Sequence, residues 1–129
     1  MRVKIAFLII LGLFMVSFSS SGKDQLVGNY KIVKTDMVIA TAYNSLEGQT
    51  DSTPWTTASG TRCREGVIAA NHLPIGTKVL IDGYGDRVFT VEDRMNARYK
   101  KRIDIWFGSY DDAMKFGKRK ITYHVLESV

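Results

Sequence analysis

Short apolar runs rich in β-branched residues recur along the chain, separated by glycine, proline and aspartate. This pattern is typical of strands joined by turns. The turn at residues 82–86 contains two glycines and suits a hairpin between the runs on either side. Six strands are expected: Met37–Tyr43, Val67–Ala70, Lys78–Ile81, Arg87–Glu92, Ile103–Phe107 and Ile121–Leu126.

One short helix is expected before the last strand. Ser109 can cap its N-terminus, with Asp112 three residues later as in a capping box, and Gly117 provides a stop. Its buried face would consist of Ala113, Met114 and Phe116. Many short strands and a single helix predict a mainly β fold, which we expect to be a small six-stranded barrel.

The first 21 residues have the pattern of an export signal. Arg2 and Lys4 precede the uncharged apolar run Ile5–Phe18, which is shorter than the roughly twenty residues of a membrane span. An uncleaved membrane anchor is therefore the less favoured alternative. We expect a signal peptide at 1–21, a lead-in segment at 22–35, a barrel domain at 36–128, and export to the periplasm, the cell envelope or the medium.

Basic residues cluster at 100–102 and 118–120, and the formal net charge of the chain is +5. The clusters would attract an acidic polymer such as cell-wall material, although a solvated surface is the simpler explanation. No nucleic-acid motif accompanies them, so nucleic acid is not an expected partner. We expect a monomer.

Cys63 is the only cysteine and cannot form an internal disulfide, so a small buried thiol is the simplest interpretation. Together with His72 and His124 it shows no metal-ligand spacing. We therefore expect no metal and no other cofactor.

Asp93 and Asp104 lie eleven positions apart, and each adjoins an apolar run expected to be a strand. A carboxylate in such a position is costly to bury unless it is paired or hydrogen-bonded. Two of them at the ends of one loop indicate a site. The structural alternative is that they form ion pairs with Arg94, Arg98 or Arg102.

Several segments occur in the order found in the 3D (Asp-Asp-Asp) domain, and Asp93 and Asp104 have that domain's spacing. These segments are Thr41-Ala42-Tyr43, Thr57-Ala58-Ser59-Gly60, Gly66–Ala70, Leu73–Val79 and Ala113–Gly117. From about Thr41 to Leu126 the chain thus resembles this family. The resemblance implies a double-psi β-barrel, related to the membrane-bound lytic transglycosylase A family and, more distantly, to rare lipoprotein A and the expansins. It also implies action on peptidoglycan glycan strands, with Asp104 as the acid/base and Asp93 as its support.

The chain departs from the family pattern in two places. The family's remaining aspartate falls at Asn71, which keeps hydrogen bonding but lacks the charge. The loop between the paired aspartates, commonly rich in glycine, is here the bulky and basic Arg94–Tyr99. Both departures leave room for a branch of the family with a different activity.

A lytic transglycosylase needs one acid, which the resemblance places at Asp104. A free aspartic acid titrates near ~3.9, so only about one in a thousand is protonated at neutral pH. Apolar neighbours and the charge of Asp93 would raise the pKa of Asp104, whereas a guanidinium within about 4–6 Å would lower it. The sequence alone leaves this balance open.

Four further residues are candidates for binding sugar. Thr41 and Tyr43 would hydrogen-bond hydroxyl groups, Asn71 would orient the acid or bind an N-acetyl group, and Trp55 would stack on a sugar face. Each also has a structural alternative, in strand packing, in a turn or in anchoring the long loop expected at 44–64. His72 is interpreted as a turn histidine rather than a base.

The sequence thus predicts an exported lytic transglycosylase that cleaves the MurNAc–GlcNAc β-1,4 bond of peptidoglycan and leaves a 1,6-anhydro product. The alternative is a non-catalytic glycan-binding or expansin-like module. A third hypothesis is a barrel whose basic loop docks an acidic protein.

Overall fold

The computed structural model describes residues 25–45 and 55–129. The expected signal peptide and part of the expected long loop lie outside these residues. The elements are β1 (Leu26–Val27), β2 (Tyr30–Tyr43), β3 (Val67–Ala69), β4 (Lys78–Ile81), β5 (Phe89–Asp93), β6 (Arg102–Trp106), α2 (Tyr110–Phe116) and β7 (Arg119–Ser128).

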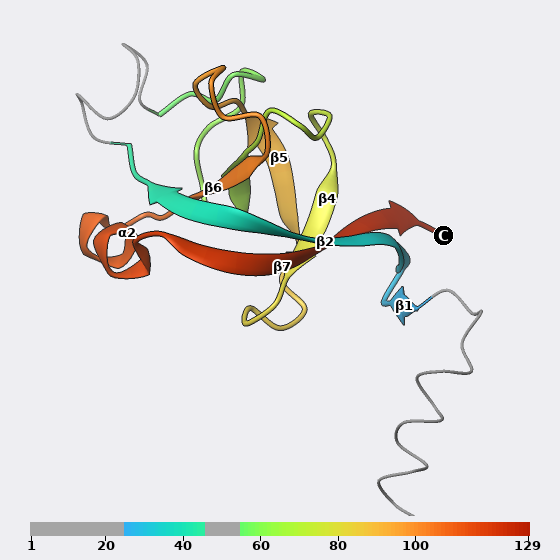
Figure 1. Cartoon of the computed structure of the whole chain (residues 1–129). Helices are drawn as coiled ribbons and strands as arrows, with labels where there is room; N and C mark the ends of the chain where they lie inside the picture. The colour runs from blue at the N-terminus through green and yellow to red at the C-terminus, as the bar shows by residue number, and fades with distance from the viewer. Residues whose placement is uncertain (1–24, 46–54) are drawn as a thin grey trace, which may run out of the picture.

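Six of the strands form a closed barrel. The strand order is β2-β6-β3-β5-β4-β7, and pairing of β2 with β7 closes it (Figure 1). The pairs β2–β6 and β3–β5 are parallel, and the other pairs are antiparallel. The prediction of a mainly β, six-stranded barrel is confirmed, and the described residues include one short helix, as predicted.

Alternation along the strands separates an inner face from an outer face. Ile103 and Ile105 on β6 pack in the main core, so Asp104 between them faces outward. A smaller cluster of Cys63, Val67 and Trp106 covers part of the outer face. The buried residues of the main core are Val38, Ala40, Ile68, Ala70, Leu73, Val79, Ile81, Phe89, Val91, Ile103, Ile105, Phe116, Ile121 and Tyr123.

The helix α2 has the predicted caps. The Ser109 hydroxyl accepts a hydrogen bond from the Asp112 amide at 3.3 Å, and Gly117 ends the helix at a φ of 64°. Ala113 and Phe116 are buried, but the prediction that Met114 joins them is wrong because it is 61% exposed. Met114 lies one position past Ala113, which turns it away from the face that Ala113 and Phe116 share.

The strand β2 is longer than expected and begins inside the segment assigned to a lead-in. Its register with β7 runs from Tyr30 opposite Ser128 to Ala40 opposite Arg119, with an irregularity between Ile32 and Lys34. Lysines and an aspartate obscure the apolar alternation there, so the sequence pattern gave little sign of a strand. In residues 25–45 and 55–129, no helix is long and apolar enough to span a membrane.

Candidate functional site

The two aspartates lie in one row across neighbouring strands. Asp104 on β6 is the register partner of Thr41 on β2 and of Ala69 on β3, and Ala69 is also the partner of Asp93 on β5. Two strand spacings separate the aspartates, or roughly 10 Å between their Cα atoms. Only the small side chain of Ala69 lies between them in the row. Four strands thus bring Thr41, Asp104, Ala69 and Asp93 to one outer face of the barrel.

Asp104 is a half-buried carboxyl group that has one hydrogen-bond donor among the described residues. Its Oδ1 accepts a hydrogen bond from the Thr41 hydroxyl at 3.0 Å. Burial raises the pKa of Asp104 to about 6, helped by the charge of Asp93, while the Thr41 hydrogen bond and the charge of Arg102 act in the opposite direction. At pH 7 an acid with this pKa is about one-tenth protonated, roughly a hundred times more than a free aspartate.

Asp93 accepts several hydrogen bonds. The Tyr43 hydroxyl donates to Oδ2 at 3.0 Å, and the amides of Ala58 and Arg94 donate to Oδ1 at 2.8 and 2.9 Å. Burial, followed by the charge and hydrogen bond of Asp93, raises the pKa of Tyr43, so its hydroxyl stays protonated and remains a donor. Thr41 and Tyr43, both predicted to bind sugar, therefore hold one aspartate each.

The arginines around the site bind elsewhere. Arg94 donates to the carbonyl oxygen of Leu73 at 2.7 Å, and the guanidinium groups of Arg98 and Arg102 lie 4.8 and 4.4 Å from the ring centroid of Tyr99. Within the described parts of the chain, neither aspartate forms an ion pair with an arginine. The alternative that these arginines neutralise the aspartates therefore has no contact in its favour.

Asn71 anchors the loop between the aspartates. Its Nδ2 lies 3.1, 2.9 and 3.1 Å from the carbonyl oxygens of Met95, Asn96 and Tyr99, and its Oδ1 accepts the Met95 amide at 3.1 Å. These bonds engage both ends of the amide. The contact of Asn71 with a substrate stays a prediction. The contacts favour an amide over a carboxylate at this position, since an aspartate here would face three carbonyl oxygens without a donor.

Trp55 lies beside the row on the outer face. The residue is 45% exposed, and its ring meets that of Trp106 edge-to-face, with centroids 6.3 Å apart. The guanidinium of Arg62 lies 5.3 Å from the Trp55 centroid. Trp106 follows Asp104 by two residues, so an exposed aromatic surface adjoins the strand that carries the acid.

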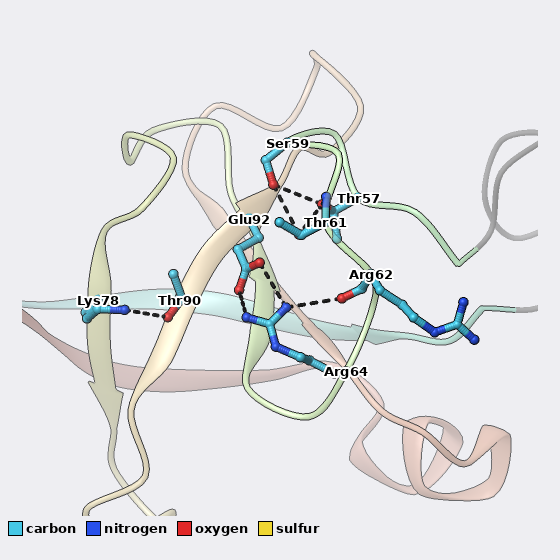
Figure 2. Close-up of polar contacts among 8 residues, drawn as sticks. All are labelled: Thr57, Ser59, Thr61, Arg62, Arg64, Lys78, Thr90 and Glu92. Atoms are coloured by element: carbon cyan, nitrogen blue, oxygen red, sulfur yellow. Dashed lines mark hydrogen bonds and ion pairs between the residues drawn. The ribbon is translucent and has the colours of Figure 1, made fainter.

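Sequence reasoning missed an ion pair next to Asp93, in which the glutamate is buried and the arginine is largely exposed. Arg64 donates to both carboxylate oxygens of Glu92, at 2.9 and 2.6 Å, as Figure 2 shows. Burial raises the pKa of Glu92, but the hydrogen bonds from Arg64 and Thr61 outweigh it, so the pKa lies below its usual value. The hydroxyl groups of Thr57, Ser59 and Thr61 form a cluster above this pair. A glutamate at the end of an apolar strand was the one available signal.

The remaining polar candidates lie outside the row. Cys63 is buried, and burial raises the pKa of its thiol. His72 has its Nε2 3.2 Å from the Tyr123 hydroxyl, and burial lowers its pKa. Among residues 25–45 and 55–129, no group of three or more histidine, cysteine or acidic side chains is arranged to hold a metal ion.

Neither a scan against protein-family models nor a search of curated proteins finds a match for this chain.

Proposed function

We propose that the protein is an exported lytic transglycosylase of the 3D type that acts on peptidoglycan glycan strands. The observation that carries the proposal is Asp104, a half-buried carboxyl group with a pKa of about 6 and no guanidinium bound to it among the described residues. At neutral pH such a group is protonated in a large enough fraction of molecules to act as a general acid. The closed barrel and the order of the family segments support the same assignment.

In the proposed reaction Asp104 acts first as the acid. It protonates the glycosidic oxygen as the bond from C1 of MurNAc to that oxygen breaks. The Asp104 carboxylate then takes the proton of the sugar's own 6-hydroxyl group, whose oxygen bonds to C1 and closes a 1,6-anhydro ring. The proton given up is thus returned, and no water is consumed. Thr41 orients Asp104 by its hydrogen bond.

Asp93 is proposed as the second carboxylate of the site. Its charge raises the pKa of Asp104, and a negative charge on this face stabilises the positive charge that develops on the sugar ring. The hydrogen bonds from Tyr43, Ala58 and Arg94 hold it in place. Tyr43 and Asn71 then act through the aspartates and their loop, and Trp55 offers the ring on which a sugar would stack.

Digestion of purified sacculi tests this proposal. The protein should release fragments ending in anhydro-MurNAc, identified by mass because each is lighter by one water than the product of hydrolysis. Asp104→Asn should release none, whereas Asp86→Asn, which changes an exposed aspartate in the turn between β4 and β5, should act like the parent. Intact sacculi under conditions in which a muramidase cuts them would contradict the proposal.

A non-catalytic glycan-binding module is the second candidate, and the exposed Trp55 favours it. An aromatic ring beside basic residues suits binding of an acidic glycan without any chemistry. In that case the parent and Asp104→Asn would pellet equally with sacculi and neither would cut, while Trp55→Ala would weaken the binding.

A further inference from the structure

An extra residue in β5 brings Asp93 into the row with Asp104. Ile68 pairs with Val91, but the next residue of β3, Ala69, pairs with Asp93, so Glu92 is left over. Such a bulge re-aims the side chains that follow it. In an unbroken register Ala69 would pair with Glu92, and Asp93 would face the apolar interior.

The ion pair between Glu92 and Arg64 fastens this bulge to the loop outside it. The Glu92 side chain is 9% exposed and receives two hydrogen bonds from Arg64. The Glu92 carbonyl oxygen accepts the Ser59 amide at 3.1 Å, and the neighbouring Ala58 amide donates to Asp93 at 2.8 Å. Figure 2 shows Glu92 enclosed between the turn that carries Ser59 and the Arg64 guanidinium.

These contacts form a chain that ends at the acid. Arg64 and Ser59 hold Glu92 from two points of one loop, the same loop gives Asp93 the Ala58 donor, and Asp93 acts on Asp104 through its charge. We propose that Glu92 and Arg64 are positioning residues that hold Asp93 beside Asp104 for the glycan cleavage proposed above. Neither needs to touch the substrate. The effect on catalysis rests on that proposed function, whereas the positioning of Asp93 does not.

NMR titration of the Asp104 carboxyl group tests the positioning without any substrate. In Glu92→Gln and in Arg64→Met the loop should loosen, Asp93 should move away, and the pKa of Asp104 should fall. Charge alone predicts opposite signs for the two variants, because Arg64→Met removes a positive charge and would raise that pKa. Glu127→Gln is the matched control, since it breaks the exposed ion pair with Lys31 at the end of β7.

Cleavage of sacculi supplies the second measurement. Each unit by which the Asp104 pKa falls lowers its protonated fraction at pH 7 about tenfold. The activity of Glu92→Gln should therefore fall in proportion to the pKa change that the titration measures. Arg64→Lys keeps the positive charge but cannot donate two parallel hydrogen bonds to Glu92, so its cleavage activity should lie between that of the parent and that of Arg64→Met. If Arg64→Met does not fold, Arg64→Lys takes its place in both measurements.

An Asp104 titration that is unchanged in Glu92→Gln, or a pKa that rises in Arg64→Met or Arg64→Lys, would overturn the positioning role. Sacculi left intact by the parent would overturn the proposed reaction instead, and the titration would still decide the positioning.

Discussion

Residue by residue, the two aspartates of the site differ in what holds them. Asp104 accepts one hydroxyl hydrogen bond from Thr41, whereas Asp93 accepts one from Tyr43 and two from backbone amides. Different surroundings of this kind give two carboxyl groups different roles in one site. Two measurements against pH, of stability and of cleavage rate, test the role that this gives to Asp104.

The first concerns stability against pH. The pKa of Asp104 in the folded protein, about 6, lies above its ordinary value of 3.8. The stability that protonated Asp104 contributes is therefore present below about pH 4 and is lost as the pH rises through about 6. The shift corresponds to at most about 3 kcal/mol at pH 7. Asp104→Asn should raise the free energy of unfolding at pH 7 by up to about that amount and should change it little at pH 4.

Urea unfolding of the parent and Asp104→Asn at both pH values provides the check. Taking the difference between the two proteins removes the contribution of other titrating groups. A variant that is less stable than the parent at pH 7 would show that ionised Asp104 is well accommodated, which contradicts the raised pKa of this group.

The second measurement is the rate of cleavage against pH. Because the reaction requires protonated Asp104, kcat/KM should fall about tenfold for each pH unit above roughly 6. Initial rates of release of anhydro fragments between pH 5 and 8 would establish the profile. A rate that is flat across this range would exclude Asp104 as the general acid.

Among the elements, the loop 94–99 is anchored in part by the side-chain amide of Asn71. Asn71 contacts three of its carbonyl oxygens and one of its amides, so Asn71→Ala should cost about 1–3 kcal/mol of unfolding free energy. Asn71→Asp should cost at least as much at pH 7, because a carboxylate would face those carbonyl oxygens. Its cost should shrink at low pH as the carboxyl gains a proton that it can donate.

Urea unfolding and amide hydrogen exchange at Met95 measure this effect. Exchange at Met95 should speed up in Asn71→Ala while exchange at Val91, in the middle of β5, stays near the parent's rate. Equal acceleration at both amides would point to global destabilisation instead of a loop anchor.

The elements also show how far the sequence could be interpreted. Short apolar runs between turn residues located each barrel strand, and Ser109 and Gly117 bounded the helix because they supply its caps. These runs could not reveal the bulge at Glu92, which inserts one residue without changing composition. The partnership of Glu92 with Arg64 also escaped, because it joins a strand to a loop 28 residues away. For Asn71, its residue type permitted a loop contact, but only the fold brings residues 95–99 to it.

In the whole molecule, closure of the barrel depends on β7. This strand pairs with β2 on one side and with β4 on the other. A chain that ends at Lys118 should therefore lose cooperative unfolding and the wide dispersion of its amide NMR signals. A chain that begins at Asn29 lacks, of the elements in residues 25–45 and 55–129, β1 alone, and should stay within about 1 kcal/mol of the parent. A folded chain without β7 would contradict the closed barrel.

The pairing of β2 with β7 has a consequence for engineering the protein. Tyr30 lies opposite Ser128, and the Val129 amide donates to the Asn29 carbonyl oxygen at 3.0 Å. The points where the backbone enters and leaves the barrel are thus adjacent, so a short linker can join them and new ends can be opened at an exposed turn such as 82–86. The barrel can equally be grafted into a surface loop of another protein without stretching either connection.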